Sequence, residues 1–212
     1  MKRAPKQRRA PAERPGEILS AALALFVEKG FAATRLDDVA ERAGLSKAAI
    51  YLYFDDKTAL LQGVIRQTIS TNIGTVETLA KAHRGPVAAL IPAILDFMAS
   101  RVEETPMASI AKLVIAESRA FPEIGRFYLK EVIGRGIPLF EGLIARGISS
   151  GEFRRVDPGL TVRSLVAPML LGMVWKTVFE PIGGEKLDVR GLARHHADLM
   201  LHALRPAPDA PS

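Results

Sequence analysis

Apolar residues recur at helical spacing along nearly the whole chain. In the first clear case Ile18, Ala22, Leu25 and Phe26 fall on one helical face, and Gly30 follows them as a stop signal. No alternation of apolar and polar residues runs far enough to predict a strand of useful length. The sequence therefore predicts an all-α protein.

The pattern predicts about nine helices separated by turn residues. We expect them at about residues 15–29, 35–43, 47–53, 57–82, 87–103, 107–119, 122–149, 158–179 and 189–204. Thr34 and Ser46 are expected to cap the second and third helices, because hydroxyl oxygens accept hydrogen bonds from the free amides of a first turn. The helix at 158–179 is apolar nearly all round, so it should be buried in a core or against another subunit.

The second and third predicted helices have the features of a helix-turn-helix. Ala40 is a small residue where the helices touch, and Gly44 permits a positive φ at the turn. Val39, Leu45 and Ile50 supply apolar anchors. In such a unit the second helix projects outward and can enter the major groove of DNA.

This pattern assigns DNA-contacting roles to residues in and around the third helix. Lys47, Ala48, Tyr51 and Leu52 are expected to face the bases, with Lys47 reaching a guanine or a phosphate and the Ala48 methyl meeting a thymine methyl. A surrounding set is expected to contact phosphates, which fixes orientation and supplies most of the affinity: Thr34, Arg35, Ser46, Tyr53 and Lys57.

The net charge of +6 is concentrated at the N-terminus. Residues 1–14 hold six basic residues and one acidic residue. This proline-containing stretch is expected to be a disordered arm whose Lys6, Arg8 and Arg9 follow phosphates or enter a minor groove. A purely solubilising tail is the alternative interpretation.

Five sequence elements at fixed offsets resemble the N-terminal signature of TetR-type regulators. They are Glu17-Ile-Leu-Ser-Ala-Ala-Leu-Ala-Leu-Phe-Val-Glu-Lys-Gly-Phe, Thr34, Asp38-Val-Ala-Glu-Arg-Ala-Gly-Leu-Ser, Ile50-Tyr-Leu-Tyr-Phe and Lys57, within residues 15–65. The family often has glycine and then threonine where this chain has Ala48 and Ala49, which removes a hydroxyl from the third helix.

The resemblance implies a regulator that binds double-stranded DNA and a small-molecule effector. Members are helical homodimers, mostly repressors, that read the half-sites of a palindromic operator and release it when the effector moves the fourth helix. The last two helices usually form a four-helix dimer interface. Here they would be 158–179 and 189–204, with Leu165, Met169, Met173, His196 and Leu199 at the contact.

The resemblance also implies a division of the chain. We expect an arm at 1–14, a DNA-binding domain at 15–60, a ligand-binding and dimerisation domain at 61–205 and a disordered tail at 206–212. The candidate pocket residues are mostly apolar or aromatic: Phe97, Met98, Leu113, Glu117, Phe127, Phe140, Leu170 and Trp175. Such residues also serve as plain core. Any charge in the pocket would come from Arg101, Glu117 or Arg126.

Composition excludes several other classes of site. The chain has no cysteine, so disulfides, thiolate metal sites and cysteine nucleophiles are excluded. His195 and His196 are adjacent and point about 100° apart on a helix, so we expect no metal there, and no cofactor is expected. We find no secretory signal, and the longest apolar run, 165–175, is interrupted by Pro168 and Gly172. The expected location is cytoplasmic, away from membranes.

An all-α enzyme or small-molecule-binding protein is the alternative function. Against an enzyme, we find no glycine-rich phosphate loop, metal-ligand helix or nucleophile elbow. Salt-sensitive DNA binding would separate the two functions, because binding through phosphates weakens steeply as salt rises.

Overall fold

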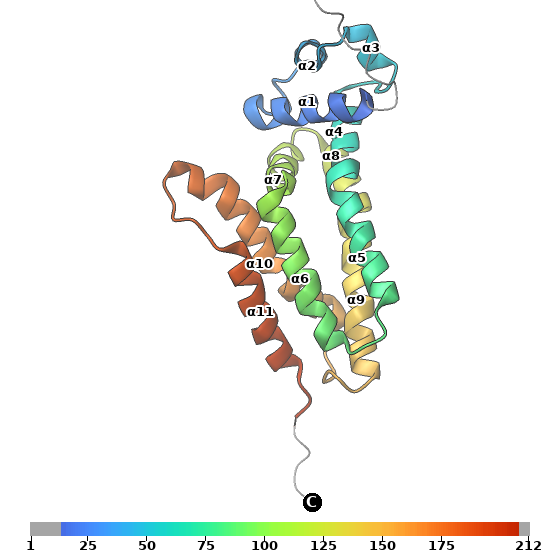
Figure 1. Ribbon diagram of the computed structural model, residues 1–212, viewed down its shortest axis with the longest axis vertical. Helices are drawn as coiled ribbons and strands as arrows, with labels where there is room; N and C mark the ends of the chain where they lie inside the picture. Colours follow the sequence, from blue (N-terminus) through green and yellow to red (C-terminus); the bar gives the residue numbers. More distant parts are fainter. Residues whose placement is uncertain (1–13, 208–212) are drawn as a thin grey trace, which may run out of the picture. The chain divides into compact units, whose positions relative to one another are not determined.

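The computed structural model describes residues 14–207, and these residues form only helices and connecting turns (Figure 1). The N-terminal elements are α1 (Arg14–Lys29), α2 (Leu36–Ala43), α3 (Lys47–Tyr51) and α4 (Lys57–Ile65). The π-helical η1 (Arg66–Ser70), α5 (Thr71–Ala82), α6 (Val87–Glu104), α7 (Met107–Glu117), α8 (Pro122–Tyr128), the π-helical η2 (Leu129–Ile133) and α9 (Gly134–Ser149) follow. The last elements are α10 (Pro158–Val174), the π-helical η3 (Trp175–Phe179), the 3₁₀ turn η4 (Glu180–Ile182) and α11 (Val189–Leu204).

Adjacent elements join without a break at three places. Helix α4 continues through η1 into α5, α8 continues through η2 into α9, and α10 continues through η3 and η4. Counted as unbroken stretches, the described residues form nine helices, which confirms the all-α prediction. The chain divides into two compact units at Arg66, residues 1–66 and residues 67–212.

The first unit is built on α1, which packs against α2 and α4. Ile18, Val39, Ile50 and Leu60 are fully buried in its core. Phe26 adds an aromatic contact with Phe31, with ring centroids 5.4 Å apart. Because Val39 on α2 and Ile50 on α3 share this core, the two short helices are fixed to α1 by apolar burial.

Three residues around α2 and α3 were predicted to end or cap a helix, and two of them, Gly44 and Ser46, do so. Gly44 ends α2 with φ +66°, a conformation that favours glycine. The Ser46 side chain accepts a hydrogen bond from the Ala49 amide at 3.2 Å, which confirms the predicted cap of α3.

The predicted cap at Thr34 is wrong. The Thr34 hydroxyl turns inward, where it donates to the carbonyl oxygen of Gly30 at 2.7 Å, and the side chain is only 2% exposed. Helix α2 instead begins after Arg35, whose amide donates to Asp38 Oδ2 at 3.2 Å. This backbone hydrogen bond lowers the pKa of Asp38.

Helix α6 lies at the centre of the second unit. It contacts α11 and α10 on one side and α9 on another, and α9 also contacts α5 and α10 (Figure 1). Two ion pairs connect these helices. The Arg190 guanidinium on α11 lies 2.6 Å from Asp96 on α6, and Arg135 on α9 lies 3.0 Å from Glu77 on α5.

Helix α10 differs from its prediction in length and burial. Together with η3 and η4 it spans Pro158–Ile182, 25 residues, and by length and composition alone it could cross a membrane. Pro168 and Gly172 were expected to interrupt the apolar run, but both residues lie inside the continuous helix. Only 17% of its most apolar window is buried, so this chain does not bury the helix on all sides.

Candidate nucleic-acid interface and ligand cavity

Helix α3 presents one accessible side, formed by Lys47, Ala48, Tyr51 and Leu52, which we call the reading surface. Lys47 and Ala48 are exposed, Tyr51 is 49% exposed and Leu52 is 78% exposed. Ile50 points the other way and is fully buried. Since residues three and four apart share a helical side, these four side chains are placed to meet a flat or grooved partner together.

Lys47 has an intramolecular partner on the reading surface. Its Nζ lies 3.1 Å from Asp37 Oδ2, and both side chains are about half exposed, at 50% and 53%. Exposed ion pairs of this kind are weak. A DNA acceptor can therefore displace Asp37, but the positive charge of Lys47 is partly neutralised until it does.

Three of the residues predicted to contact phosphates are exposed at the surface of this unit. Arg35 and Ser46 are exposed, and Tyr53 is 37% exposed. Thr34 differs, since its buried hydroxyl donates within the protein. A phosphate contact through the Thr34 side chain is incompatible with this structure.

Lys57 holds the start of α4 to the preceding loop. Its Nζ donates to the carbonyl oxygens of Phe31 at 2.7 Å and Ala32 at 2.9 Å. The ammonium also lies 4.5 Å from the centroid of the Phe31 ring, a cation–π contact. The predicted phosphate contact at Lys57 therefore belongs to a residue that also has a structural role.

The described part of the first unit carries no net charge. Residues 14–66 contain seven basic and seven acidic residues. Some of these charges pair across helices, as Arg42 on α2 does with Glu28 on α1 at 2.6 Å, which lowers the pKa of Glu28. The arm residues Lys6, Arg8 and Arg9 lie outside the described residues.

The second unit contains a cavity of about 310 Å³ with an almost wholly apolar lining. Its walls come from α5, α6, α9 and α10, with single residues from η1, α7 and α8 and two from η2. This size is at the lower end of small-molecule pockets, at roughly 300–1,000 Å³. The cavity is the candidate ligand site among the described residues.

Four of the eight predicted pocket residues line this cavity: Phe97, Met98, Phe140 and Leu170. Leu113 is buried elsewhere, at 7% exposure, and neither Glu117 nor Phe127 reaches the cavity. Helix α8 contributes Tyr128 in place of its neighbour Phe127, because consecutive helical residues point in different directions.

Trp175 was also predicted for the pocket and lies outside its lining. Its indole Nε1 donates to the carbonyl oxygen of Glu185 at 2.9 Å. Its ring packs against Phe179, with centroids 5.3 Å apart. The residue thus connects η3 to the loop before α11 instead of meeting a ligand.

Sequence reasoning missed the wall supplied by η1 and α5. Ile69, Ile73 and Val76 line the cavity, together with Asn72. The spacing of four and then three residues between the apolar members is the helical signal that could have found them. That spacing does not show which other helices these side chains face.

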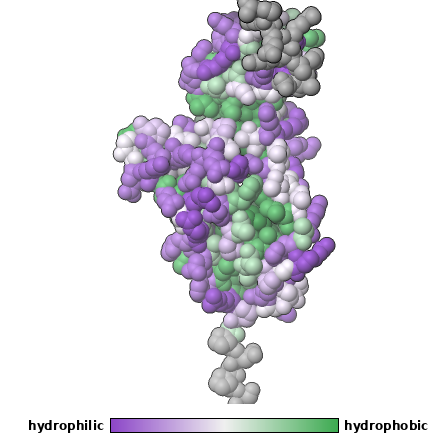
Figure 2. All heavy atoms as spheres, in the orientation of Figure 1, coloured by the Kyte–Doolittle hydropathy of each residue, from purple (hydrophilic) through white to green (hydrophobic). Residues whose placement is uncertain are grey.

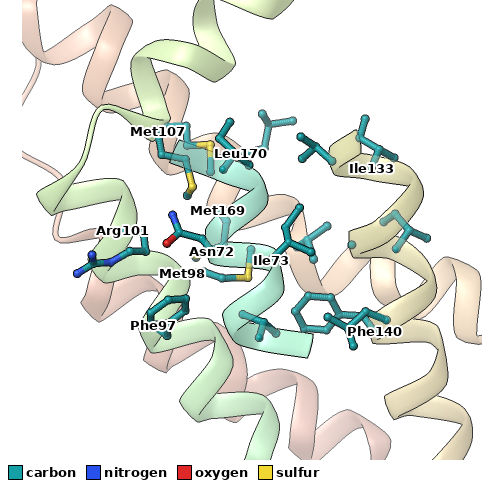
Figure 3. A pocket seen from close by; sticks show the side chains of 18 of the residues that line it. Asn72, Ile73, Phe97, Met98, Arg101, Met107, Ile133, Phe140, Met169 and Leu170 are labelled. Carbon is teal, nitrogen blue, oxygen red and sulfur yellow. The ribbon is translucent and has the colours of Figure 1, made fainter. Parts of the chain in front are cut away.

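Three polar side chains reach the lining: Asn72, Arg101 and Tyr128. Figure 3 shows Asn72 turning its amide toward the side of the cavity where α6 carries Arg101, with Phe97 and Met98 beside them. Burial raises the pKa of Tyr128 to about 12, so its hydroxyl stays neutral. Arg101 is thus the only charged residue in the described lining.

The predicted interface residues divide into two groups. Leu165 and Met169 are buried within the chain, at 0% and 1% exposure, and Met173 lines the cavity. A direct subunit contact through Leu165 and Met169 is therefore wrong, and one through Met173 stays a prediction. Leu199 is 53% exposed, and His196 Nε2 lies 3.1 Å from the carbonyl oxygen of Ser164, which ties α11 to α10.

Large apolar side chains instead remain exposed on the outer side of α10 and on the segment after it. They are Leu160, Leu170, Leu171, Phe179 and Ile182, between 40% and 78% exposed. Several exposed large apolar residues on one helix and the segment after it differ from the single scattered ones of an ordinary surface. Together with Leu199 they form an uncovered apolar face, which we call the outer face.

Both units match known protein families. Residues 18–64 match "Bacterial regulatory proteins, tetR family", and residues 89–198 match "AefR-like transcriptional repressor, C-terminal domain". The chain is 31% identical over 168 residues to the HTH-type transcriptional regulator RutR of Escherichia coli (strain K12), covering 72% of this chain and 70% of that protein. It is 29% identical over 185 residues to the HTH-type transcriptional regulator YfiR of Bacillus subtilis (strain 168), covering 85% and 87%.

Solved structures share the fold. PfmR from Thermus thermophilus, a TetR family transcriptional regulator, gives a TM-score of 0.70 at 26% identity and covers 87% of this chain and 97% of its own. FadR from Bacillus subtilis in complex with stearoyl-CoA gives 0.74 at 18% identity, covering 90% and 99%.

Proposed function

The chain belongs to the TetR family of bacterial transcriptional regulators, and from that premise we propose that it is a cytoplasmic repressor released from a palindromic operator by a small-molecule effector. Membership makes the chain a soluble DNA-binding regulator with a ligand-binding C-terminal domain, and not an enzyme. The proposal adds the operator type, the sign of regulation and the release step.

The observation that carries the proposal is the reading surface. Ala48 and its neighbours are exposed on a helix whose opposite side is fixed to the core through Ile50. A small side chain at position 48 lets the helix backbone approach base edges closely. Arg35, Ser46 and Tyr53 remain at the surface of the same unit, where they would hold the phosphates.

A palindromic operator requires a symmetric dimer. The outer face supports such a dimer, because Leu171 and Leu199 are half exposed on the last two helices. We propose that two copies pair through α10 and α11, with Leu160 and Leu171 replacing the buried Leu165 and Met169 of the sequence-based prediction. Burying these side chains would remove apolar area from water.

The two units are connected by one continuous helical stretch of the chain, through which effector binding would act on the DNA-binding unit. The chain is helical without a break from Lys57 to Ala82, and this stretch contains both the last helix of the first unit and a wall of the cavity. Ile69 in the π-helical η1 lines the cavity three residues beyond Arg66, where the units meet in sequence. We propose that an effector shifts this helix and thereby changes the spacing of the two reading surfaces.

Substitution at the reading surface tests the DNA-binding part of the proposal. We expect Ala48→Trp to abolish sequence preference while the protein stays folded, because an indole cannot fit against the bases at this position. Ala116→Trp, at an exposed position on α7, is the matched control. Fluorescence anisotropy on selected operator and scrambled duplexes gives the two affinities. Equal operator preference in both variants and the wild type would refute the assignment of α3.

A further inference from the structure

The described cavity lining contains a single charged residue among mostly apolar ones. Of its nineteen residues, Arg101 alone carries a charge, and no carboxylate from the described residues lines it. Asn72 and Tyr128 add neutral polar groups, and the other lining residues are apolar. In an apolar cavity, a single cation in the wall attracts an anion and repels a second cation.

Arg101 has a guanidinium donor without a partner. Its Nε is buried and makes no hydrogen bond. A second nitrogen, Nη2, pairs with Glu104, whose side chain is 52% exposed, and the guanidinium lies 5.7 Å from the centroid of the Phe97 ring. Leaving a buried charged donor unsatisfied is costly, so the Nε–H is a favourable partner for a ligand acceptor.

Asn72 is oriented toward the same side of the cavity. Its Nδ2 donates to the carbonyl oxygen of Thr68 at 2.8 Å, one turn earlier on the same helical stretch. That bond fixes the amide plane and leaves the second Nδ2 hydrogen for another acceptor. Figure 3 shows this amide pointing toward the α6 side that carries Arg101, away from Ile133 and Phe140. Arg101 and Asn72 therefore place two polar groups on one side of the cavity.

The apolar part of the lining is adaptable. Met98, Met107, Met169 and Met173 all line the cavity, and they are four of the six methionines in the chain. Unbranched thioether side chains fill irregular gaps and adjust to different shapes. Figure 2 shows apolar surface gathered on the face of the second unit where Figure 1 draws α5 and α6, two of the helices that form the walls. The lining thus suits flexible hydrocarbon better than a rigid polar molecule.

We propose that the effector is a small amphiphile with an apolar body and a single anionic head, such as a medium-chain carboxylate. The head accepts hydrogen bonds from the buried Arg101 Nε–H and the Asn72 amide, and the body lies against the methionines and Phe140. This inference rests on the proposed function only in treating the cavity as the effector site. The volume of about 310 Å³ favours a medium chain over a long one.

The test compares three ten-carbon probes that differ only in their head groups. Decanoate, decanol and decylammonium are titrated into the full-length protein without DNA, and isothermal titration calorimetry gives each dissociation constant. We expect decanoate to bind at least about tenfold more tightly than decanol, the effect of one charge-assisted hydrogen bond, and decylammonium to bind most weakly. Equal affinities for decanoate and decanol, or no binding of any probe, would overturn the inference.

A pair of matched variants assigns the preference to Arg101. Arg101→Met replaces the charged side chain by a shorter unbranched apolar one, and Arg119→Met makes the same change at an exposed position outside the cavity. We expect Arg101→Met to lose the tenfold preference for decanoate while its affinity for decanol changes by less than about twofold. Thermal unfolding checks that both variants fold. Retention of the full preference in a folded Arg101→Met protein would contradict the assignment.

The two proposals fail in distinguishable ways. Ligand titrations without DNA do not depend on operator binding, so a protein that binds decanoate but no operator would refute the proposed function alone. A protein that binds operator and releases it with decanol and decanoate alike would refute the anionic head alone. Release by decanoate only, abolished in Arg101→Met, supports both.

Discussion

Lys47 and Lys57 both begin helices of the first unit, but they have different roles in the free protein. Lys47 pairs with Asp37 in an exposed contact that a DNA acceptor can replace. Lys57 donates to two backbone carbonyls and lies over the Phe31 ring, so its removal would disturb the fold as well as any phosphate contact. A loss of DNA binding in a Lys57 variant would therefore not identify a phosphate contact by itself.

Releasing Lys47 from Asp37 should strengthen DNA binding. We expect Asp37→Asn to raise affinity for a random duplex more than Glu41→Gln does, by about two- to fivefold, because only the first change frees a paired ammonium. Glu41 is exposed on the same helix and loses the same charge, which makes it the matched control. Anisotropy at low salt measures both affinities. If the DNA affinity of the two variants increases equally, the Lys47–Asp37 pair has no influence on binding.

The sequence predicted which residues are exposed on α3, but not their partners. The helix-turn-helix pattern places Lys47, Ala48, Tyr51 and Leu52 on the outward part of this helix, and all four are exposed in the structure. The inward hydroxyl of Thr34 was not predictable, because its acceptors belong to the end of α1 and depend on how that helix meets the next loop.

Ion pairs between helices make stability depend on pH at the scale of elements. Arg190 on α11 donates to Asp96 on α6 at 2.6 Å, and this hydrogen bond lowers the pKa of Asp96 below its ordinary value of 3.8. A carboxylate with a depressed folded-state pKa stabilises the fold above the unfolded pKa. The stabilisation disappears as pH falls from about 3.8 through the folded-state pKa.

Asp96→Asn tests this linkage. We expect the variant to lose about 1 kcal/mol of unfolding free energy at pH 7, a small value because the paired side chains are 34% and 41% exposed. The difference from the wild type should shrink below about pH 4, where the native carboxylate is also being protonated. Urea denaturation at several pH values measures both curves. A difference that is independent of pH would rule out the charge as its cause.

Helix boundaries were predictable because the signals that set them are local. Gly44 and Ser46, for example, end α2 and cap α3 through contacts within a few residues. The cavity wall from α5 and the exposure of α10 were not predictable from the sequence, because they depend on which sides of separate helices meet. Leu165 and Leu171 are both apolar and six residues apart on α10, yet one is fully buried and the other is 52% exposed.

At the scale of the whole molecule, the outer face predicts self-association. We expect Leu171→Glu to convert a dimer into monomers, because a carboxylate cannot be buried unpaired in an apolar interface. Leu79→Glu, on α5, is the control, since Leu79 is 46% exposed and Leu171 is 52% exposed. Sedimentation equilibrium gives the mass of each. A dimeric Leu171→Glu protein would place the interface elsewhere.

Charge distribution also acts at the scale of the whole chain. Residues 14–66 are electrically neutral overall, whereas residues 1–13 hold five basic residues and one acidic residue. We expect deletion of residues 1–13 to lower operator affinity several-fold and to flatten the salt dependence by about 0.9 for each phosphate that the arm neutralises in the full-length protein. Affinity measured across a salt series tests this. Unchanged affinity and slope would make the arm a solubilising tail.

Operator selection from random duplex DNA, repeated at about 50 mM and 200 mM salt, tests the central claim of a dimeric DNA-reading regulator most directly. The account predicts enrichment of a palindrome whose half-sites suit two copies of α3, with affinity that falls steeply as salt rises. Folded protein that enriches no sequence at either salt concentration would contradict it.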